Sequence, residues 1–164
     1  MEGKAYTGPI INGKKILADF GVNLLINAAS GRPYTAKLRP TRFDAIGTVG
    51  SVNGSRLPWR FNADFRVDKT FRVNPKAKTP LEVNVYLRVA NLLNRLNVIS
   101  VYRASGSPTD DGFLAGSDGI SEIREVELNG LDKQAYIDSY SWLVRNPNNF
   151  AQPRRIFVGA SFIF

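Results

Sequence analysis

The sequence predicts an all-β fold: an antiparallel transmembrane β-barrel segment of about five long strands, an incomplete barrel, with one long loop that holds a short helix. Three observations predict this fold. Apolar and polar residues alternate over long segments. These segments have about ten residues or more, whereas strands of soluble proteins centre near five or six. Their apolar faces consist almost entirely of Phe, Val, Leu, Ile and Ala, as a lipid-facing surface requires.

The first three predicted strands lie near residues 16–28, 60–73 and 80–91. In "RFNADFRVDKTFRV" (60–73) the odd-numbered positions are apolar except Lys69, and the even-numbered positions are polar. "LEVNVYLRVA" (81–90) repeats this alternation, and the turn-forming "NPKAKT" (74–79) between the two predicts a β-hairpin. "DFGVNLLINA" (19–28) likewise separates Phe20, Val22, Leu24 and Ile26 from its polar positions. A helix would mix the two sets around its circumference.

Two further strands are predicted near 97–104 and 154–164. The facing of "VISVYRA" (98–104) stays open. The terminal "RIFVGASFIF" (155–164) alternates up to Phe164, and Pro153 stands just before it, where a missing N–H costs little.

Two long stretches, 29–58 and 105–152, lack a strand pattern. The second begins with "SGSPTDDGFLAGSDG", whose composition predicts a flexible loop. Its later part, "DKQAYIDSYSWLVRNP" (132–147), has Tyr136, Tyr140 and Leu143 at helical spacing, which predicts a short helix.

Composition excludes several functional classes. The 164 residues contain no Cys and no His, which removes Ser-His-Asp and Cys-His centres and the usual zinc sites. We therefore expect no enzyme, no cofactor and no metal. The net charge is +8, but Lys and Arg are scattered along the chain, so no nucleic-acid partner is expected. No run of about 20 apolar residues predicts a membrane-spanning helix.

Four motifs in order resemble the C-terminal part of the β-barrel of TonB-dependent outer-membrane receptors. They are "ASGRPYT" (29–35), "LPWRFNADFRVDKTF" (57–71), "LEVNVYLRVANLLNRLNV" (81–98) and "NPNNFAQPRRIFVGASFIF" (146–164). The third departs from the family at Leu93, where Phe is usual. The resemblance covers most of the chain, so residues 1–164 are expected to form one C-terminal barrel portion.

The resemblance implies part of an active importer in the outer membrane of a Gram-negative cell. Its partners would be further barrel strands and a plug domain of the same receptor, TonB acting through that plug, the barrel-assembly machinery and membrane lipid. Phe162 and Phe164 would form the C-terminal signal for barrel assembly. With the last strand running inward and five strands counted back, 91–97 would be periplasmic and 105–152 extracellular. The same count would place 29–58 in the periplasm, although this segment is long for a periplasmic turn.

Two sets of candidate site residues follow. A ladder of charges facing the barrel lumen would contact the plug or pair across strands: Asp64, Arg66, Asp68, Glu82 and Arg88. An extracellular set would contact substrate, or else pack the loop: Asp110, Asp111, Tyr136, Tyr140 and Trp142. Oxygen-rich loops such as 108–119 can also hold calcium, although the spacing of an EF-hand loop is absent.

Two other interpretations fit the alternation. One is a barrel that does not transport actively, such as an adhesin or a passive porin. The other is a soluble basic β-sandwich binding module, whose apolar faces would meet in one core. The substrate of an importer is not defined by these residues.

Overall fold

The computed structural model describes residues 9–15, 17–73 and 81–163. Its strands are β1 (Ile10–Ile11), β2 (Lys14–Lys15), β3 (Phe20–Ala29), β4 (Pro33–Tyr34), β5 (Arg39–Thr41), β6 (Asp44–Ile46), β7 (Ser55–Arg56), β8 (Arg60–Val73), β9 (Leu81–Ala90) and β10 (Arg155–Ile163). Its helices are α1 (Ser117–Leu128) and α2 (Lys133–Leu143), with short 3-10 turns η1 (Phe113–Ala115) and η2 (Pro147–Asn149).

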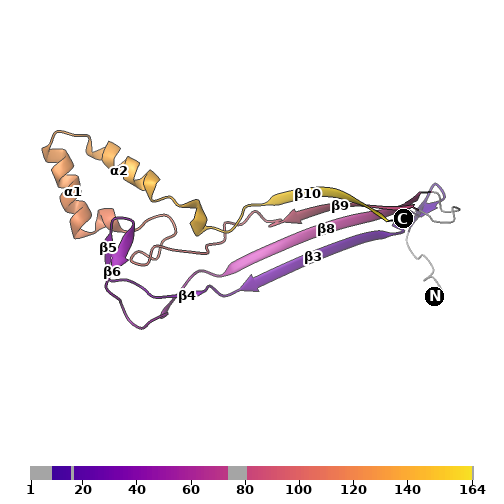
Figure 1. Cartoon of the computed structure of the whole chain (residues 1–164), viewed down its shortest axis with the longest axis horizontal. Helices are drawn as coiled ribbons and strands as arrows, with labels where there is room; N and C mark the ends of the chain where they lie inside the picture. Colours follow the sequence, from indigo (N-terminus) through magenta and orange to yellow (C-terminus); the bar gives the residue numbers. More distant parts are fainter. Residues whose placement is uncertain (1–8, 16, 74–80, 164) are drawn as a thin grey trace. The chain divides into compact units, whose positions relative to one another are not determined.

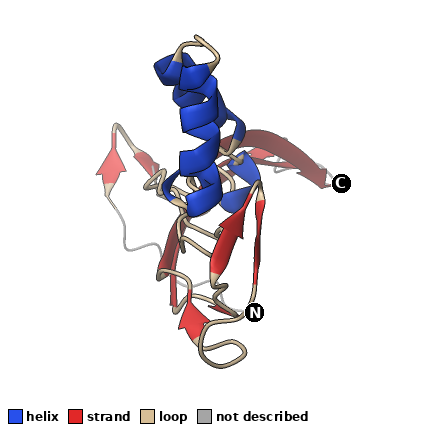
Figure 2. Cartoon of the chain, turned by 90° about the vertical axis from the view of Figure 1, so that its left-hand side faces the viewer, coloured by secondary structure: helices blue, strands red, loops and turns tan. Residues whose placement is uncertain are grey.

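The chain divides into two compact units. The first, the sheet unit, comprises residues 1–26, 62–94 and 154–164 and holds the long strands. The second, the loop unit, comprises residues 27–61 and 95–153 and holds both helices and the short strand pairs β4–β7 and β5–β6. Figure 1 shows the four long strands side by side, and Figure 2 shows the helices of the loop unit in blue.

The sheet unit is one antiparallel sheet of four strands in the order β10-β9-β8-β3. β9 pairs with β10 from Arg155↔Ala90 to Ile163↔Glu82, and with β8 from Phe65↔Val89 to Val73↔Leu81. β3 runs antiparallel to β8, since Asp19 accepts from the amide of Thr70 while Gly21 lies against Asp68. The structure thus has a strand in four of the five predicted ranges.

The fifth predicted strand, near 97–104, is wrong. Within 98–104 only Val98 forms a β-bridge, to Phe150, and residues 103 and 104 lie in a turn. Backbone groups of this segment are satisfied singly by loop partners, for instance Ile99 N–H by the carbonyl of Asn149 at 2.9 Å. Because this strand is absent, β9 and β10 are direct neighbours, and the predicted order of strand directions is also wrong. The segments 29–58 and 105–152 leave the same end of the sheet, not opposite ends.

The long stretch 105–152 is more ordered than predicted. α2 lies inside the range predicted to hold a helix, and its N-cap Asp132 accepts from the amides of Gln134 at 2.8 Å and Ala135 at 3.1 Å. The loop prediction was wrong for α1, which begins after Gly116 and has Asp118 in its first turn, where a negative charge is favourable.

The sheet has two faces of opposite character. Residues opposite each other in the register share a face, so the apolar positions of all four strands form one continuous surface, the apolar face. This face is largely uncovered, and Val158 is 75% exposed. Its one charged residue is Lys69, whose ammonium donates to the carbonyl of Ala18, just before β3. Within the described residues, the outer edges of β3 and β10 have no strand partner in this sheet.

Candidate functional site

The polar face of the sheet brings together all five predicted lumen charges. Asp64, Arg66 and Asp68 stand at alternate positions of β8, with Arg66 directly opposite Arg88 of β9. Glu82 lies further along β9, opposite Arg72. The geometry therefore places these charges on one side of the sheet, which also carries Phe157 and Ile163 of β10, and most apolar side chains on the other.

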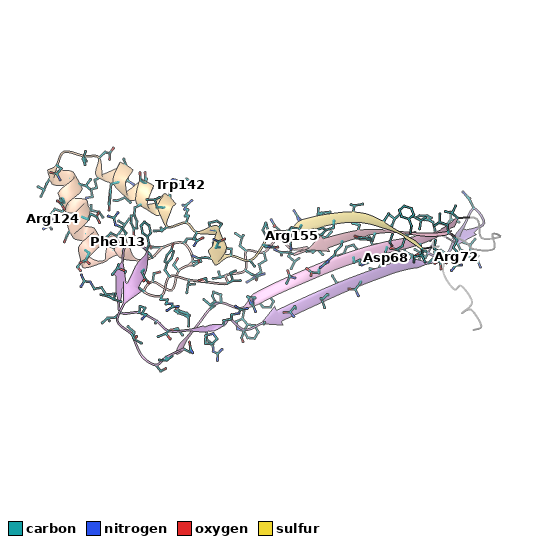
Figure 3. All side chains as sticks on the ribbon, in the orientation of Figure 1. Asp68, Arg72, Phe113, Arg124, Trp142 and Arg155 are labelled. Atoms are coloured by element: carbon teal, nitrogen blue, oxygen red, sulfur yellow. The ribbon has the colours of Figure 1, made fainter. Side chains whose placement is uncertain are left out.

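Ion pairs and amide hydrogen bonds connect one end of this polar face. Arg72 Nε donates to Glu82 Oε1 at 3.0 Å, and its Nη2 lies 3.5 Å from Asp19 Oδ1. Asn84 Nδ2 bridges Asp68 Oδ2 at 3.3 Å and Thr70 Oγ1 at 3.0 Å. These groups are partly exposed, so solvent screens each pair and its contribution to the stability of the sheet is small. Figure 3 labels Asp68 and Arg72 on β8.

Toward the end of the sheet where β9 ends and β10 begins, the polar face carries more positive than negative side chains. Arg66 pairs with Asp68 at 3.3 Å and lies 4.8 Å from the ring centroid of Tyr86. Arg88 and Arg155 lie 5.9 Å and 5.6 Å from the centroid of Phe157. Like charges directly opposite each other destabilise a sheet. Arg66 is balanced by Asp68, whereas Arg88 and Arg155 form no ion pair among the described residues.

Tyr86 and Gly159 form a tight pair across β9 and β10. A Cβ atom placed on Gly159 would lie 2.5 Å from the Tyr86 hydroxyl oxygen and 2.6 Å from Cζ. The ring therefore occupies the space that any other residue at 159 would fill. Aromatic covering of a strand glycine is a device that fixes register in curved sheets.

Asp111 is the structural centre of the loop unit. It is 1% exposed, and its Oδ2 accepts from the Tyr140 hydroxyl at 2.6 Å and from the Phe43 amide at 3.1 Å. Its Oδ1 accepts from the Phe113 amide at 3.0 Å. One carboxylate thus joins the β5–β6 hairpin, η1 and α2, and burial together with the bond to Asp111 raises the pKa of the Tyr140 phenol.

The β5–β6 hairpin is held in an uncommon conformation by these contacts. Phe43 has φ 63°, a left-handed value that is rare for a bulky residue. Its ring stacks on Tyr140 with centroids 5.6 Å apart, and its amide is bonded to Asp111. The surrounding packing compensates for the backbone strain at this position.

Two arginines of the same hairpin bind α1. Arg39 Nη2 contacts both carboxylate oxygens of Asp118, at 2.5 and 2.6 Å, and Arg42 pairs with Glu122 one turn further along the helix. The bond to Arg39 lowers the pKa of the Asp118 carboxyl, and the bond to Glu122 raises the pKa of the Arg42 guanidinium. These arginines could not be predicted from the sequence, because residues 29–58 lack a strand or helix pattern.

A groove of about 660 Å³ opens beside α2 in the loop unit. Apolar side chains line most of it, among them Leu96, Leu114, Val144 and Phe150. Asp110 and Arg145 add one charge of each sign. This volume lies within the range of about 300–1,000 Å³ that is common for small-molecule sites.

The predicted extracellular residues do not form one site. Asp111 is buried, and Tyr140, at 3% exposed, packs with Phe113 and Val144. Tyr136 reaches Arg42 through its hydroxyl, at 3.4 Å. Trp142, labelled in Figure 3, is 70% exposed on α2. Asp110 lines the groove, and Figure 3 also labels the buried Phe113. The expectation that Asp111 contacts substrate is wrong, because its oxygens are occupied within the loop unit.

Other predicted features have simple outcomes. Phe162 is exposed on the apolar face, and Phe164 lies outside the described residues. Over the described ranges, no group of three or more acidic, His or Cys side chains is arranged to hold a metal. In the same part of the chain, no helix is both long and apolar enough to cross a membrane.

Comparison with known proteins found no relative: no family model, no curated protein and no solved structure matches the chain. What is known of the fold therefore comes from the structure itself, which in its described residues is mostly antiparallel β-sheet with two α-helices.

Proposed function

We propose that this chain forms part of the wall of a β-barrel in the outer membrane of a Gram-negative cell, within an importer of the TonB-dependent class. The observation that carries the proposal is the continuous, exposed apolar face of four long strands, backed by a polar face. β3, β9 and β10 have ten, ten and nine residues, close to the 9–11 that a tilted membrane-spanning strand needs.

The apolar face requires an apolar neighbour. An exposed patch larger than a few hundred Å² marks an interaction surface, and burying one Val, Leu, Ile or Phe side chain stabilises a protein by about 1.5–3 kcal/mol. Lipid is a suitable neighbour, because the face carries no charge except Lys69. The ammonium of Lys69 reaches the backbone near the strand end, as a snorkelling lysine does.

The sheet edges and the polar face suggest the remaining parts. Hydrocarbon does not tolerate unpaired backbone groups, so the outer edges of β3 and β10 would pair with further strands of the same receptor. The cations Arg66, Arg88 and Arg155 of the polar face would face a plug domain in the lumen. TonB would act on that plug, and the barrel-assembly machinery would recognise Phe162 and Phe164 in the C-terminal sequence. The resemblance described above is the basis for these partners.

Adjacent residues on β10 offer a direct test. Ala160 belongs to the apolar face and Ser161 to the polar face, both are exposed, and the chain has no native Cys. Ala160→Cys and Ser161→Cys would each carry one nitroxide label in the full chain, in detergent micelles. We expect the label at 160 to be relaxed mainly by oxygen, which partitions into apolar phases, and the label at 161 mainly by a water-soluble nickel complex.

Three other outcomes would contradict the proposal in different ways. A label at 160 that neither reagent reaches would support the soluble β-sandwich, whose core would cover this face. Equal access of the nickel complex to both labels would show that the apolar face lies in water. A cooperatively melting monomer in plain buffer, by circular dichroism and sedimentation, would also exclude a membrane wall.

A further inference from the structure

We infer that the groove beside α2 binds a short peptide with free termini and apolar side chains. Asp110 would receive the peptide ammonium, and Arg145 would receive the peptide carboxylate. Every lining residue belongs to the loop unit, so this inference does not rest on the membrane proposal.

The two charges of the groove lack opposite partners. Among the residues that the structure describes, neither Asp110 nor Arg145 has an oppositely charged group within 4.0 Å. One oxygen of Asp110 accepts from the Gly112 amide at 2.8 Å, which leaves the other for a ligand. The Arg145 guanidinium lies 4.8 Å from the centroid of Trp142, a contact that leaves its N–H donors available.

The ligand chemistry follows from this lining. Asp110 and Arg145 line the same groove but form no ion pair within 4.0 Å of each other, so a ligand that neutralises both needs a positive and a negative group. The rest of the lining is mainly apolar and includes Leu96, Val144 and Phe150. An apolar peptide would bury side chains against these residues and place its two charged ends at Asp110 and Arg145.

Buried residues preform the groove. Val144 and Tyr140 are each 3% exposed and pack with Phe113, while Asp111 holds the Tyr140 hydroxyl. Binding therefore needs little ordering of the protein, which favours affinity.

The test is a titration of the full chain with trileucine. Trp59→Phe leaves Trp142 as the one remaining Trp of the two in the chain, and a carboxylate that draws Arg145 away should change the Trp142 fluorescence. We expect a saturable change with trileucine. Acetylating its N-terminus or amidating its C-terminus should each weaken binding about tenfold, the loss expected for one charge-assisted hydrogen bond.

Matched variants assign each terminus to its residue. In Asp110→Asn, acetylation should no longer weaken binding, and in Arg145→Gln, amidation should no longer weaken it. Arg124→Gln, on the exposed side of α1, should keep both effects. Because Arg145→Gln itself alters the surroundings of Trp142, isothermal titration calorimetry provides a second measurement for that variant.

The inference is overturned by any of three results in a chain whose circular dichroism is native. One is the absence of saturable binding in both assays. Another is equal binding of capped and free peptides. The third is the persistence of both capping effects in Asp110→Asn and Arg145→Gln. The nitroxide experiment on β10 can fail or succeed independently, since no residue of the groove lies in the sheet.

Discussion

The substitution Val158→Arg places a charge in the middle of the apolar face. Val158 is one residue from the centre of the nine-residue strand β10 and is 75% exposed, so the change removes little packing within the chain. In water, such a surface substitution should alter the free energy of unfolding by no more than about 0.5 kcal/mol. Any larger effect therefore reports what surrounds this face.

The magnitude in a membrane follows from strand geometry. One residue along a strand tilted by about 45° corresponds to about 2–3 Å of depth, so Val158 would lie close to the middle of an apolar band about 25 Å tall. An Arg near the midplane costs about 2–4 kcal/mol. With a urea slope of about 2 kcal/mol/M, the unfolding midpoint should fall by about 1–2 M.

The assay is urea unfolding of the full chain in lipid vesicles or micelles, followed by far-UV circular dichroism. Ser161→Arg is the matched control, because Ser161 lies on the polar face of the same strand, opposite Asn84. We expect this control to stay within about 0.5 kcal/mol of the parent. If Val158→Arg is equally mild, or if the two variants are equally destabilised, the apolar face does not contact lipid.

Three further predictions concern single contacts. Gly159→Val should destabilise the sheet by about 1–3 kcal/mol, because the valine side chain would meet the Tyr86 ring, and this cost should be much smaller in a Tyr86→Ala background. Chemical unfolding of the parent, the two single variants and the double variant measures the difference. Asp111→Ala should destabilise the loop unit by more than about 2 kcal/mol and expose the two amides bonded to its carboxylate to hydrogen exchange, whereas Asp110→Ala should cost about 1 kcal/mol or less. Folding raises the pKa of Tyr140, so the stabilisation that this phenol contributes is complete below its unfolded pKa of about 10 and is lost as pH rises toward its folded pKa. Tyr140→Phe should remove this loss in thermal unfolding measured between pH 9 and 12, and an unchanged dependence of stability on pH would contradict the role given to Tyr140.

The sequence was sufficient to predict the long strands and their two faces. Alternation is a local property, because successive side chains of a strand point to opposite faces whatever the neighbouring strand is. β8 therefore has the predicted bounds, and the register places its apolar positions beside those of β9. Pairing is not local, and this explains the error at 98–104: β-branched residues favour an extended backbone but do not specify a partner.

Of the two helices, only α2 was predicted from the sequence. α2 has an N-cap Asp132 and aromatic residues at helical spacing. α1 has comparable signals, with Ile120, Ile123 and Val126 three residues apart, but the preceding Gly-rich and Asp-rich composition favoured a loop. The bonds of Asp111 to Phe43 and Tyr140 span 68 and 29 residues, and no local pattern distinguishes a buried Asp from a solvated one.

The corrected topology bears on the proposed function. With β9 and β10 as direct antiparallel neighbours, the segments 29–58 and 105–152 both leave the sheet at one end, whereas β8 ends and β9 begins at the other. The five-strand prediction required a long periplasmic segment at 29–58, which is uncommon, since outer-membrane barrels have short periplasmic turns and long extracellular loops. The four-strand sheet removes that conflict. Both long segments would be extracellular and join in one loop unit, so a ligand in the groove of that unit would bind on the outside of the cell.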